Sequence, residues 1–381
     1  MRIAYFNANL RKGQDGVTRV MYKMFEGAVA RNVEAIAFAS TLPDADDAII
    51  PTYKVPSVVL PIQKSYRLAL PSYHLFARRL NAFRPDIVHI NSPCTLGLGA
   101  LRYATHYDLP VVATYHTHFP TYPRYYRMEG LEEVVWKVSR RLYNNMDRTF
   151  VPSVPILEEL KEHDIERLEY LPNGVDLSLF HPTRRSGPWR SRFGAGQKPV
   201  VLFVSRLVWE KDLAVLADVY SLLRSRGCNF EMVVVGDGHA RNELEMMMPG
   251  AHFLGSQTGT TLAESYASSD IFVFPSTTET FGLVTLEAMA SGLVPVAANV
   301  GGAAEIVQDG VSGIHVPPLD RIAMANEIER LLNNAHLRES MRAAAFRRAN
   351  QYGWETILEQ LFASYADVID SSNRGRRSRA A

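Results

Sequence analysis

The chain has 381 residues, enough for two domains of about 180 residues each. Hydrophobic residues make up 47% and charged residues 21%, the profile of an ordinary globular protein. Lysine and arginine together number 41 against 40 aspartate and glutamate residues, which gives a formal net charge of +1. A charge this small does not attract the chain to nucleic acid. A nucleic-acid partner is therefore not expected.

The sequence also shows neither a transmembrane segment nor a signal peptide. No apolar stretch reaches the roughly 20 residues that cross a bilayer, and a strand-like run follows Met1 directly, without a signal-peptide pattern. The two cysteines, Cys94 and Cys228, are far apart and are expected as free thiols of a reducing compartment. These features predict a cytoplasmic location.

In chain order, short β-branched strands alternate with helices. The first part has expected strands at residues 86–90, 110–115 and 149–151, and expected helices at residues 73–82 and 131–144. Such alternation is typical of parallel sheets covered by helices on both faces.

A segment rich in proline and glycine, residues 177–198, interrupts this pattern. Buried strands are then expected at residues 199–204, 230–235, 271–274 and 294–297. The sequence therefore predicts an α/β fold with two facing, doubly wound Rossmann-like domains. Ligands of such sheets bind at the carboxyl ends of the strands, so we expect the site in an interdomain cleft.

The expected domains are residues 1–184, for the acceptor, and residues 196–353, for the donor. A closing helix at about residues 354–370 is expected to pack back on the first domain. The arginine-rich end, residues 371–381, has almost no apolar content. It is expected to be a disordered tail, with contact to an anionic surface as the alternative.

The most informative segment is residues 274–292, where a strand ends, a polar loop carries Glu279 and a helix begins near Gly282. A helix start leaves backbone N–H groups at Gly282, Leu283 and Val284 without intrahelical partners, at the positive end of the helix dipole. Glycine also lets a ligand approach the backbone closely. This pattern predicts a diphosphate-binding site.

A second glutamate, Glu287, follows just over one turn into this helix. A carboxylate beside bound phosphate would be repelled, so the hydroxyl pair of a ribose is its expected partner. Glu279 is expected to face the reacting sugar. Two glutamates at this spacing, taken alone, also fit a solvated loop acid and an ordinary helix acid.

Here the sequence resembles glycosyltransferase family 4, the retaining nucleotide-sugar enzymes with the GT-B fold. Glu279 and Glu287 match the family's Glu-x7-Glu signature, with Phe281-Gly282-Leu283 between them. Further motifs match in order: Pro172-Asn173-Gly174-Val175-Asp176, Ser205-Arg206-Leu207 followed by Lys211, Val235-Gly236-Asp237-Gly238 and Gly301-Gly302-Ala303-Ala304-Glu305. The resemblance implies a nucleotide-sugar donor held by these segments, with Gly236, Gly238 and Phe281 among the donor-binding residues.

Arg206 and Lys211 suit the chemistry of such a transfer. Negative charge develops on the departing diphosphate, and a metal or fixed cations must receive it. Arginine offers a planar fork for phosphate oxygens, whereas lysine offers a movable point charge. These cations and the helix start near Gly282 are expected to suffice, so no metal or other cofactor is predicted. Exposed, purely structural charges are the alternative.

In the first domain, Gly16 opens the expected first helix, where family members often have two adjacent glycines. Contact between its backbone and the donor phosphates and a merely structural turn both fit. The resemblance places His116 beside the donor sugar and makes His118 an acceptor-side residue. Two structural histidines are the alternative, and a zinc site is disfavoured because no third ligand lies nearby.

The aromatic and basic segment 121–127 resembles glycolipid-forming members of the family, including sulfoquinovosyl and GDP-mannose-dependent mannosyl transferases. Tyr122 suits sugar rings or acyl chains, and Arg124 suits an anionic acceptor. The region 64–84 is read either as a helix resting on a membrane or as an ordinary amphipathic helix with a solvated face. Peripheral membrane contact is thus left open.

Together these inferences predict a retaining hexosyltransferase. It would move a hexose from GDP-mannose or a UDP-sugar to a lipid or glycan acceptor and give an α-glycoside. The family implies attack on the face of departure, with the departing phosphate accepting the acceptor's proton. The alternatives are a nucleotide-sugar epimerase, which would convert the donor alone, and a non-catalytic nucleotide-sugar sensor.

Overall fold

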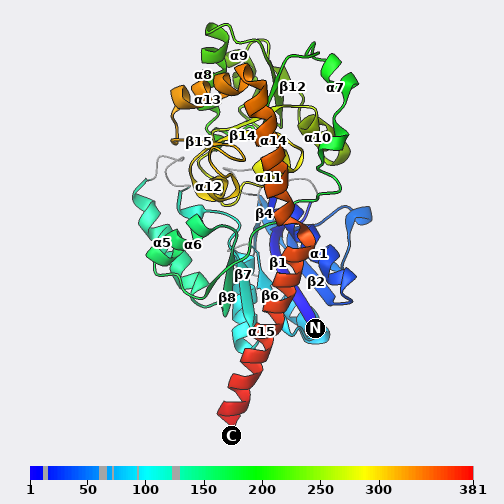
Figure 1. The fold of residues 1–381 in the computed structure, drawn as a ribbon. Coiled ribbons are helices and arrows are strands. Elements are labelled where there is room, and N and C mark those ends of the chain that lie inside the picture. Colours follow the sequence, from blue (N-terminus) through cyan, green and yellow to red (C-terminus); the bar gives the residue numbers. More distant parts are fainter. Residues whose placement is uncertain (12–15, 60–66, 71–72, 92–93, 122–128, 381) are drawn as a thin grey trace. The chain divides into compact units, whose positions relative to one another are not determined.

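A computed structural model describes residues 1–11, 16–59, 67–70, 73–91, 94–121 and 129–380 (Figure 1). The chain forms two compact units. The first unit contains residues 1–172 and 355–381, and the second contains residues 173–354.

The first unit is built on a seven-stranded parallel sheet in the order β3-β2-β1-β6-β7-β8-β9. Its strands are β1 (Arg2–Asn9), β2 (Glu34–Thr41), β3 (Thr52–Lys54), β6 (Ile87–Ile90), β7 (Val111–Thr114), β8 (Arg148–Val151) and β9 (Leu168–Tyr170). A separate antiparallel pair is formed by β4 (Ser57–Val59) and β5 (Arg67–Ala69). Its helices are α1 (Gly16–Ala30), α2 (Tyr73–Phe83), α3 (Thr95–His106), α5 (Glu132–Tyr143), α6 (Val154–Glu162) and α15 (Trp354–Ala380), with short 3-10 turns η1 (Ala45–Asp47), η2 (Phe119–Thr121) and η3 (Glu129–Leu131).

The strand β1 shows why this sheet is covered on both faces. Ala4 and Phe6 belong to the cluster on one face, where the Phe6 and Phe38 rings stack with centroids 5.0 Å apart. Tyr5 points to the other face and meets Phe25 of α1 edge-on at 5.2 Å. A strand buried on both faces needs a continuous apolar run, as β1 has.

The long helix α15 covers part of this second face. The Tyr365 hydroxyl lies 2.5 Å from Nδ1 of His89, and Ser364 and Asp367 hydrogen-bond the Arg148 guanidinium at 2.7 Å each. The helix continues to Ala380, so the disordered tail expected from residue 371 is wrong.

The second unit has a six-stranded parallel sheet in the order β12-β11-β10-β13-β14-β15. Its strands are β10 (Val200–Val204), β11 (Glu231–Val235), β12 (His252–Phe253), β13 (Ile271–Phe274), β14 (Val294–Ala298) and β15 (Ile314–Val316). Its helices are α7 (Gly187–Ser191), α8 (Leu213–Ser225), α9 (Arg241–Met247), α10 (Gly259–Ala267), α11 (Leu283–Ala290), α12 (Gly301–Ile306), α13 (Arg321–Asn333) and α14 (Ala335–Ala349), with 3-10 turns η4 (Pro182–Arg184), η5 (Trp209–Lys211) and η6 (Asn350–Tyr352).

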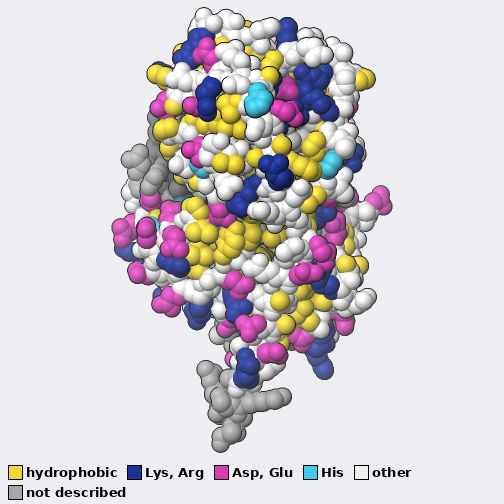
Figure 2. All heavy atoms as spheres, in the orientation of Figure 1, with side chains coloured by type: hydrophobic (Ala, Val, Ile, Leu, Met, Phe, Trp, Pro, Cys, Tyr) yellow, Lys and Arg dark blue, Asp and Glu magenta, His cyan; other side chains and the backbone are white. Residues whose placement is uncertain are grey.

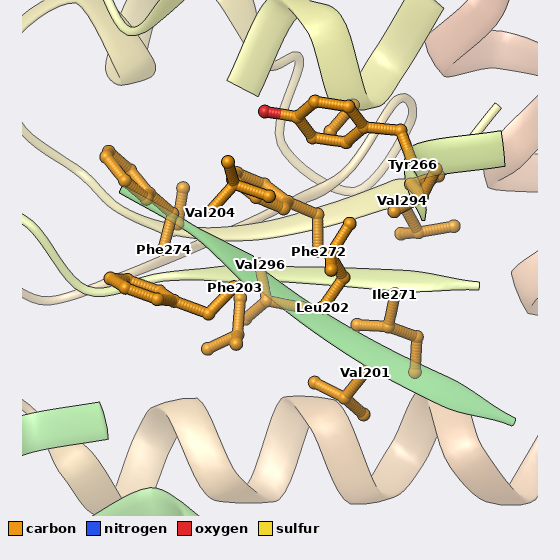
Figure 3. Packing of buried hydrophobic residues seen from close by; sticks show 14 of the residues in the cluster. Val201, Leu202, Phe203, Val204, Tyr266, Ile271, Phe272, Phe274, Val294 and Val296 are labelled. Atoms are coloured by element: carbon orange, nitrogen blue, oxygen red, sulfur yellow. The ribbon is translucent and has the colours of Figure 1, made fainter. Parts of the chain in front are cut away.

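The core of the second unit lies around β10 and β13 (Figure 3). All five residues of β10 are buried, and the four residues of β13 are at most 1% exposed. Phe203 and Phe274 stack with ring centroids 6.3 Å apart. The chain leaves β10 toward β11 on one side, whereas β13 lies on the other. This reversal is the topological switch point at which doubly wound sheets bind ligands.

The boundary between the units differs from the expected one. It falls after Pro172 instead of residue 184, because the intervening segment packs on the second unit. The Val175 amide donates to the Tyr352 carbonyl at 2.8 Å, and the Phe180 ring meets Tyr266 edge-on at 5.7 Å.

The region 64–84 is not one helix. Residues 67–69 form the strand β5, and the helix α2 starts at Tyr73. Phe76, Ala77 and Leu80 bury one face of α2, while Leu75 is 63% exposed. The helix is thus amphipathic with one exposed leucine.

Candidate functional site

The predicted donor residues of the second unit gather at one edge of its sheet. Arg206 follows β10, Gly236 follows β11, Glu279 follows β13 and Gly301 follows β14. These four strands are neighbours in the sheet and all run parallel, so their carboxyl ends share one edge. Tertiary structure thereby brings together motifs that are far apart in the sequence.

Lys211 and Glu279 form the central contact of this edge. The Lys211 ammonium nitrogen lies 2.5 Å from Oε1 of Glu279 and donates to the Thr278 hydroxyl at 3.2 Å. The side chains of Lys211 and Glu279 are 12% and 21% exposed. Their contact is therefore shielded from bulk water. A shielded ion pair is stronger than one on an open surface, because the effective dielectric constant is lower.

Asp212 holds this pair in place, a role that sequence analysis missed. Its Oδ2 accepts hydrogen bonds from the Thr277 amide at 2.8 Å and the Thr277 hydroxyl at 2.9 Å. Asp212 has a left-handed backbone with φ of 54°, which aspartate tolerates better than most residues. Burial raises the pKa of its carboxyl, while the hydrogen bonds from Thr277 and the charge of Lys211 oppose this rise.

The helix α11 begins beside this loop. Gly282 is its N-cap, with φ of 90°, a conformation that favours glycine. The first helical hydrogen bonds are donated by Thr285 and Leu286 to the Gly282 carbonyl. The amides of Leu283 and Val284 precede these bonds, and no acceptor for them is found in the described part of the chain. The structure thus has a helix start of the kind that binds anions.

The glycines of the Gly-x-Gly turn have a packing role. A Cβ atom at Gly236 would overlap the Ser205 carbonyl oxygen, and one at Gly238 would overlap that of Leu207. The Leu207 amide donates to the Asp237 carbonyl at 2.9 Å. This close approach fixes the backbone on both sides of Arg206. Direct contact of these glycines with the donor stays a prediction.

Arg206 itself is exposed. Its side chain makes no hydrogen bond or ion pair with any residue that the structure describes. The structure thus joins Lys211 to Glu279 but does not join Arg206 to either. A cation without a protein partner remains able to bind a ligand, so its role toward the diphosphate stays a prediction.

The late glycine pair packs against the Glu279 loop. A Cβ atom at Gly301 would overlap the Glu279 carbonyl oxygen, and one at Gly302 would overlap the Phe281 backbone. The Gly302 amide donates to the Glu279 carbonyl at 3.3 Å. The Phe281 side chain is 2% exposed and meets the Tyr352 ring edge-on at 6.1 Å. Phe281 therefore anchors the loop in the core.

Glu287 is buried, at 5% exposure. Its Oε2 accepts a hydrogen bond from the Tyr266 hydroxyl at 3.1 Å. The interpretation as an ordinary solvated helix acid is therefore wrong. Burying a carboxylate is costly without polar partners, so this position has a specific polar environment. The role toward a ribose stays a prediction.

In the first unit, His116 and Asn91 follow the adjacent strands β7 and β6. Nε2 of His116 lies 3.0 Å from Oδ1 of Asn91. Burial lowers the pKa of His116 to about 4, so its ring is neutral near pH 7. The helix α1 begins at Gly16, which follows β1 at the same edge of the sheet.

The acceptor-side residues fall in two groups. His118 is 6% exposed, and its Nε2 lies 2.9 Å from Oε2 of Glu159 on α6. Its ring also meets Trp136 edge-on at 5.6 Å. These contacts favour the structural alternative for His118, and its acceptor role stays a prediction. Tyr122 and Arg124 lie outside the described residues.

The described residues contain no group of three or more His, Cys, Asp or Glu side chains placed to hold a metal ion. Among them, too, no helix combines the length and apolarity needed to cross a bilayer. The chain has one Asp-x-Asp sequence, Asp44 to Asp46, and all three of its residues are solvent-accessible beside or in η1.

The sequence of this chain matches two known families, one in each half. Residues 188–348 match the family described as "Glycosyl transferases group 1", and residues 14–179 match "Glycosyltransferase Family 4". A GDP-mannose-dependent alpha-mannosyltransferase of Corynebacterium glutamicum is 32% identical, with 98% of this chain and 91% of the relative covered. A sulfoquinovosyl transferase of Arabidopsis thaliana is 37% identical, with 73% of this chain and 56% of the relative covered.

Among solved structures, the Anabaena protein HepE in complex with UDP and glucose superimposes with a TM-score of 0.79. The match covers 96% of this chain and 99% of that chain at 19% identity, a similarity that shows the fold. Two Rossmann-like units with these motifs define a GT-B glycosyltransferase that uses a nucleotide sugar. The chain belongs to glycosyltransferase family 4, in the branch of the GDP-mannose-dependent and sulfoquinovosyl enzymes.

Proposed function

We propose that this enzyme transfers a hexose from GDP-mannose, or from a UDP-sugar, to a lipid or glycan acceptor with retention of anomeric configuration. Support for GDP-mannose comes from the mannosyltransferase relatives, which match nearly the whole chain at 31–32% identity. Support for a lipid acceptor comes from the resemblance of segment 121–127 to glycolipid-forming members of the family and from the match to a sulfoquinovosyl transferase.

The observation that carries the proposal is the Lys211–Glu279 contact beside the start of α11. An ammonium group has three N–H donors, and Glu279 and Thr278 account for two of them. The third is available for an oxygen of the leaving diphosphate. Amides at the start of α11 supply further donors, and Arg206 supplies a second cation.

In this mechanism the donors are in place before the reaction. Negative charge grows on the diphosphate as the glycosidic bond breaks, and fixed donors stabilise that charge without reorganisation. The acceptor hydroxyl attacks the face from which the diphosphate departs, and its proton passes to the departing phosphate oxygen. The proton and the developing charge are thus both accounted for without a nucleophile from the protein and without a metal.

Other residues orient the sugar nucleotide. Glu279 contacts the hexose, and its bond to Lys211 holds the carboxylate in one position. Glu287 accepts from the ribose hydroxyls, oriented by Tyr266. His116 is neutral and hydrogen-bonds a hexose hydroxyl. Gly16 brings the start of α1 to the donor phosphates.

A lipid acceptor would be reached by peripheral contact of a cytoplasmic enzyme with the inner face of the membrane. Flotation of the purified chain with vesicles rich in phosphatidylglycerol measures this contact. Recovery of all the protein at the bottom of the gradient would contradict it.

The central test follows transfer from GDP-mannose and from UDP-glucose to diacylglycerol in vesicles and to soluble oligosaccharides. Product mass identifies the acceptor, and the one-bond C1–H1 coupling in NMR identifies the anomer. We expect an α-linked product. A β-linked product would refute retention, and conversion of the donor without any acceptor would instead support an epimerase.

A further inference from the structure

The second unit contains a cavity of about 670 Å³ at the amino-terminal edge of its sheet. Pro199 and Asp270 line it, and they come directly before β10 and β13. The carboxyl ends of these two strands lead to Arg206 and Glu279. The cavity and the donor site therefore lie at opposite edges of the same sheet.

Arginine dominates the wall of this cavity. Its charged lining residues are Arg185, Arg190, Arg338, Arg342, Asp270 and Glu339. Four guanidinium groups thus face two carboxylates, which leaves an excess of two positive charges. The whole chain carries a formal net charge of only +1, so this excess is local. Figure 2 shows Lys and Arg side chains gathered beside α7. Gly187 and Arg190 of this helix line the cavity.

Asp270 neutralises only part of this charge. Its carboxylate oxygens lie 2.8 Å from Arg185 and 3.0 Å from Arg190, whereas Arg342 is 4.0 Å away. Asp270 is 5% exposed, and the cations beside it hold its pKa below the usual range despite burial. One buried carboxylate is therefore shared among three arginines.

Two arginines keep unused donors. Arg338 donates through Nη1 to the Leu331 carbonyl at 2.6 Å, and Arg342 donates through Nε to the Gly292 carbonyl at 2.6 Å. For Nη2 of either side chain, no acceptor is present among the described residues. Burial and the charges of Arg185 and Arg338 lower the pKa of Arg342, while the carboxylates of Glu339 and Asp270 oppose this shift.

A helix start adds to the positive potential. Ala335, the first residue of α14, also lines the cavity. The helix has 15 residues, so its dipole places partial positive charge at this end. Arginine forks match the geometry of phosphate oxygens, and a phosphate dianion would balance the excess of two charges.

We propose that this arginine cavity binds the phosphate group of a small phosphorylated molecule, at a site separate from the donor site. The cavity exceeds the size of one phosphate, so it also has room for an attached organic group. Free phosphate and a phosphate ester share this chemistry. Two probes, inorganic phosphate and glycerol 3-phosphate, distinguish them.

The test is calorimetric titration of the full chain with each probe at constant ionic strength. Arg185→Gln and Arg338→Gln should each weaken binding at least about tenfold, because each removes a charge that faces the ligand. Tighter binding of glycerol 3-phosphate than of inorganic phosphate would identify an ester as the ligand. Equal affinities would identify free phosphate.

Two controls make the result specific. Arg226→Gln removes an arginine of the same unit that pairs with Glu329 elsewhere, and it should leave binding unchanged. The Lys211→Ala change, which acts on the donor site, should leave it unchanged too. Absence of saturable binding to the unaltered chain, or loss of binding in Lys211→Ala, would overturn the proposal. Arg338→Gln leaves the ion pairs of Asp270 with Arg185 and Arg190 intact. If Arg185→Gln fails to fold, the phosphate affinity of Arg338→Gln tests the proposal.

Discussion

Oδ2 of Asp212 accepts two hydrogen bonds from Thr277, one from its amide at 2.8 Å and one from its hydroxyl at 2.9 Å. Lys211 precedes Asp212, and Glu279 lies in the same loop as Thr277. This single carboxylate therefore ties the cation and the acid of the donor site to each other.

We expect Asp212→Ala to lower kcat about tenfold or more and to reduce the free energy of unfolding by about 1–3 kcal/mol, because the two Thr277 donors lose their acceptor. Asp212→Asn should preserve most of the kcat and most of the free energy of unfolding, since asparagine tolerates a left-handed backbone and keeps a carbonyl acceptor. Steady-state kinetics and urea unfolding measure the two quantities. Equal kinetic losses in both variants would instead assign a role to the Asp212 charge.

Lys211→Ala should reduce kcat by about 10²–10³-fold, the usual effect of removing one donor that stabilises developing charge. Donor KM should change much less. A matched control is Lys198→Ala, which removes the cation of the Lys198–Glu231 pair, 3.0 Å long, from the same unit. If both variants retained similar kcat values, Lys211 would have no part in leaving-group stabilisation.

Glu287→Ala should raise the donor KM about tenfold or more and leave kcat comparatively unchanged, because ribose binding is the same in the ground and transition states. Tyr266→Phe removes the hydroxyl that bonds Glu287 and should raise KM by a smaller factor. Initial rates over a range of donor concentrations separate the parameters. An unaltered KM in Glu287→Ala would remove the ribose role.

The His116 ring gives a pH-dependent prediction. Its folded pKa of about 4 lies below its ordinary value of 6.5, so the unfolded chain binds a proton more readily between these pH values. The free energy of unfolding should therefore fall as pH drops through this window, by at most about 1.4 kcal/mol per pH unit from this group.

His116→Gln should flatten that slope, and urea midpoints at several pH values measure it. Part of the slope should persist, because burial also holds the pKa of His89 well below the usual value. An identical slope in the variant would contradict the assignment to His116.

Gly302→Ala tests the packing beneath the Glu279 loop. A Cβ atom there would overlap the Phe281 backbone, so the loop must move. We expect a kcat loss of at least about tenfold, because small displacements of positioned groups cost large factors in rate. Gly187→Ala is the control, since a Cβ atom at Gly187 meets nothing within 4 Å. Similar kcat values in the two variants would show that the loop tolerates this displacement.

Much of the fold could be predicted from local patterns. Continuous apolar runs such as residues 200–204 occur where a parallel strand is buried on both faces, and they mark strands without any tertiary information. The unit boundary could not be placed in the same way. Residues 173–184 contain no periodic pattern, and their assignment to the second unit depends on contacts such as Val175 with Tyr352.

Some residues of the candidate site could likewise be predicted from local sequence, and others could not. Glu279, Gly282 and Glu287 were recognisable because their chemistry depends on residue type and spacing within one strand–loop–helix segment. Asp212 was not, because an aspartate after a lysine has no local signature. Its function arises from a partner, Thr277, that is 65 positions away in the chain.

The sequence alone determined the family, the alternation of strands and helices and the types of charged group available at the donor site. These are properties of residues close together in the chain, where periodicity and motif spacing act directly. Tertiary structure decided which groups meet: Lys211 with Glu279, and four arginines around one cavity. Such meetings depend on strand order, because parallel neighbours in a sheet bring distant segments to a common edge.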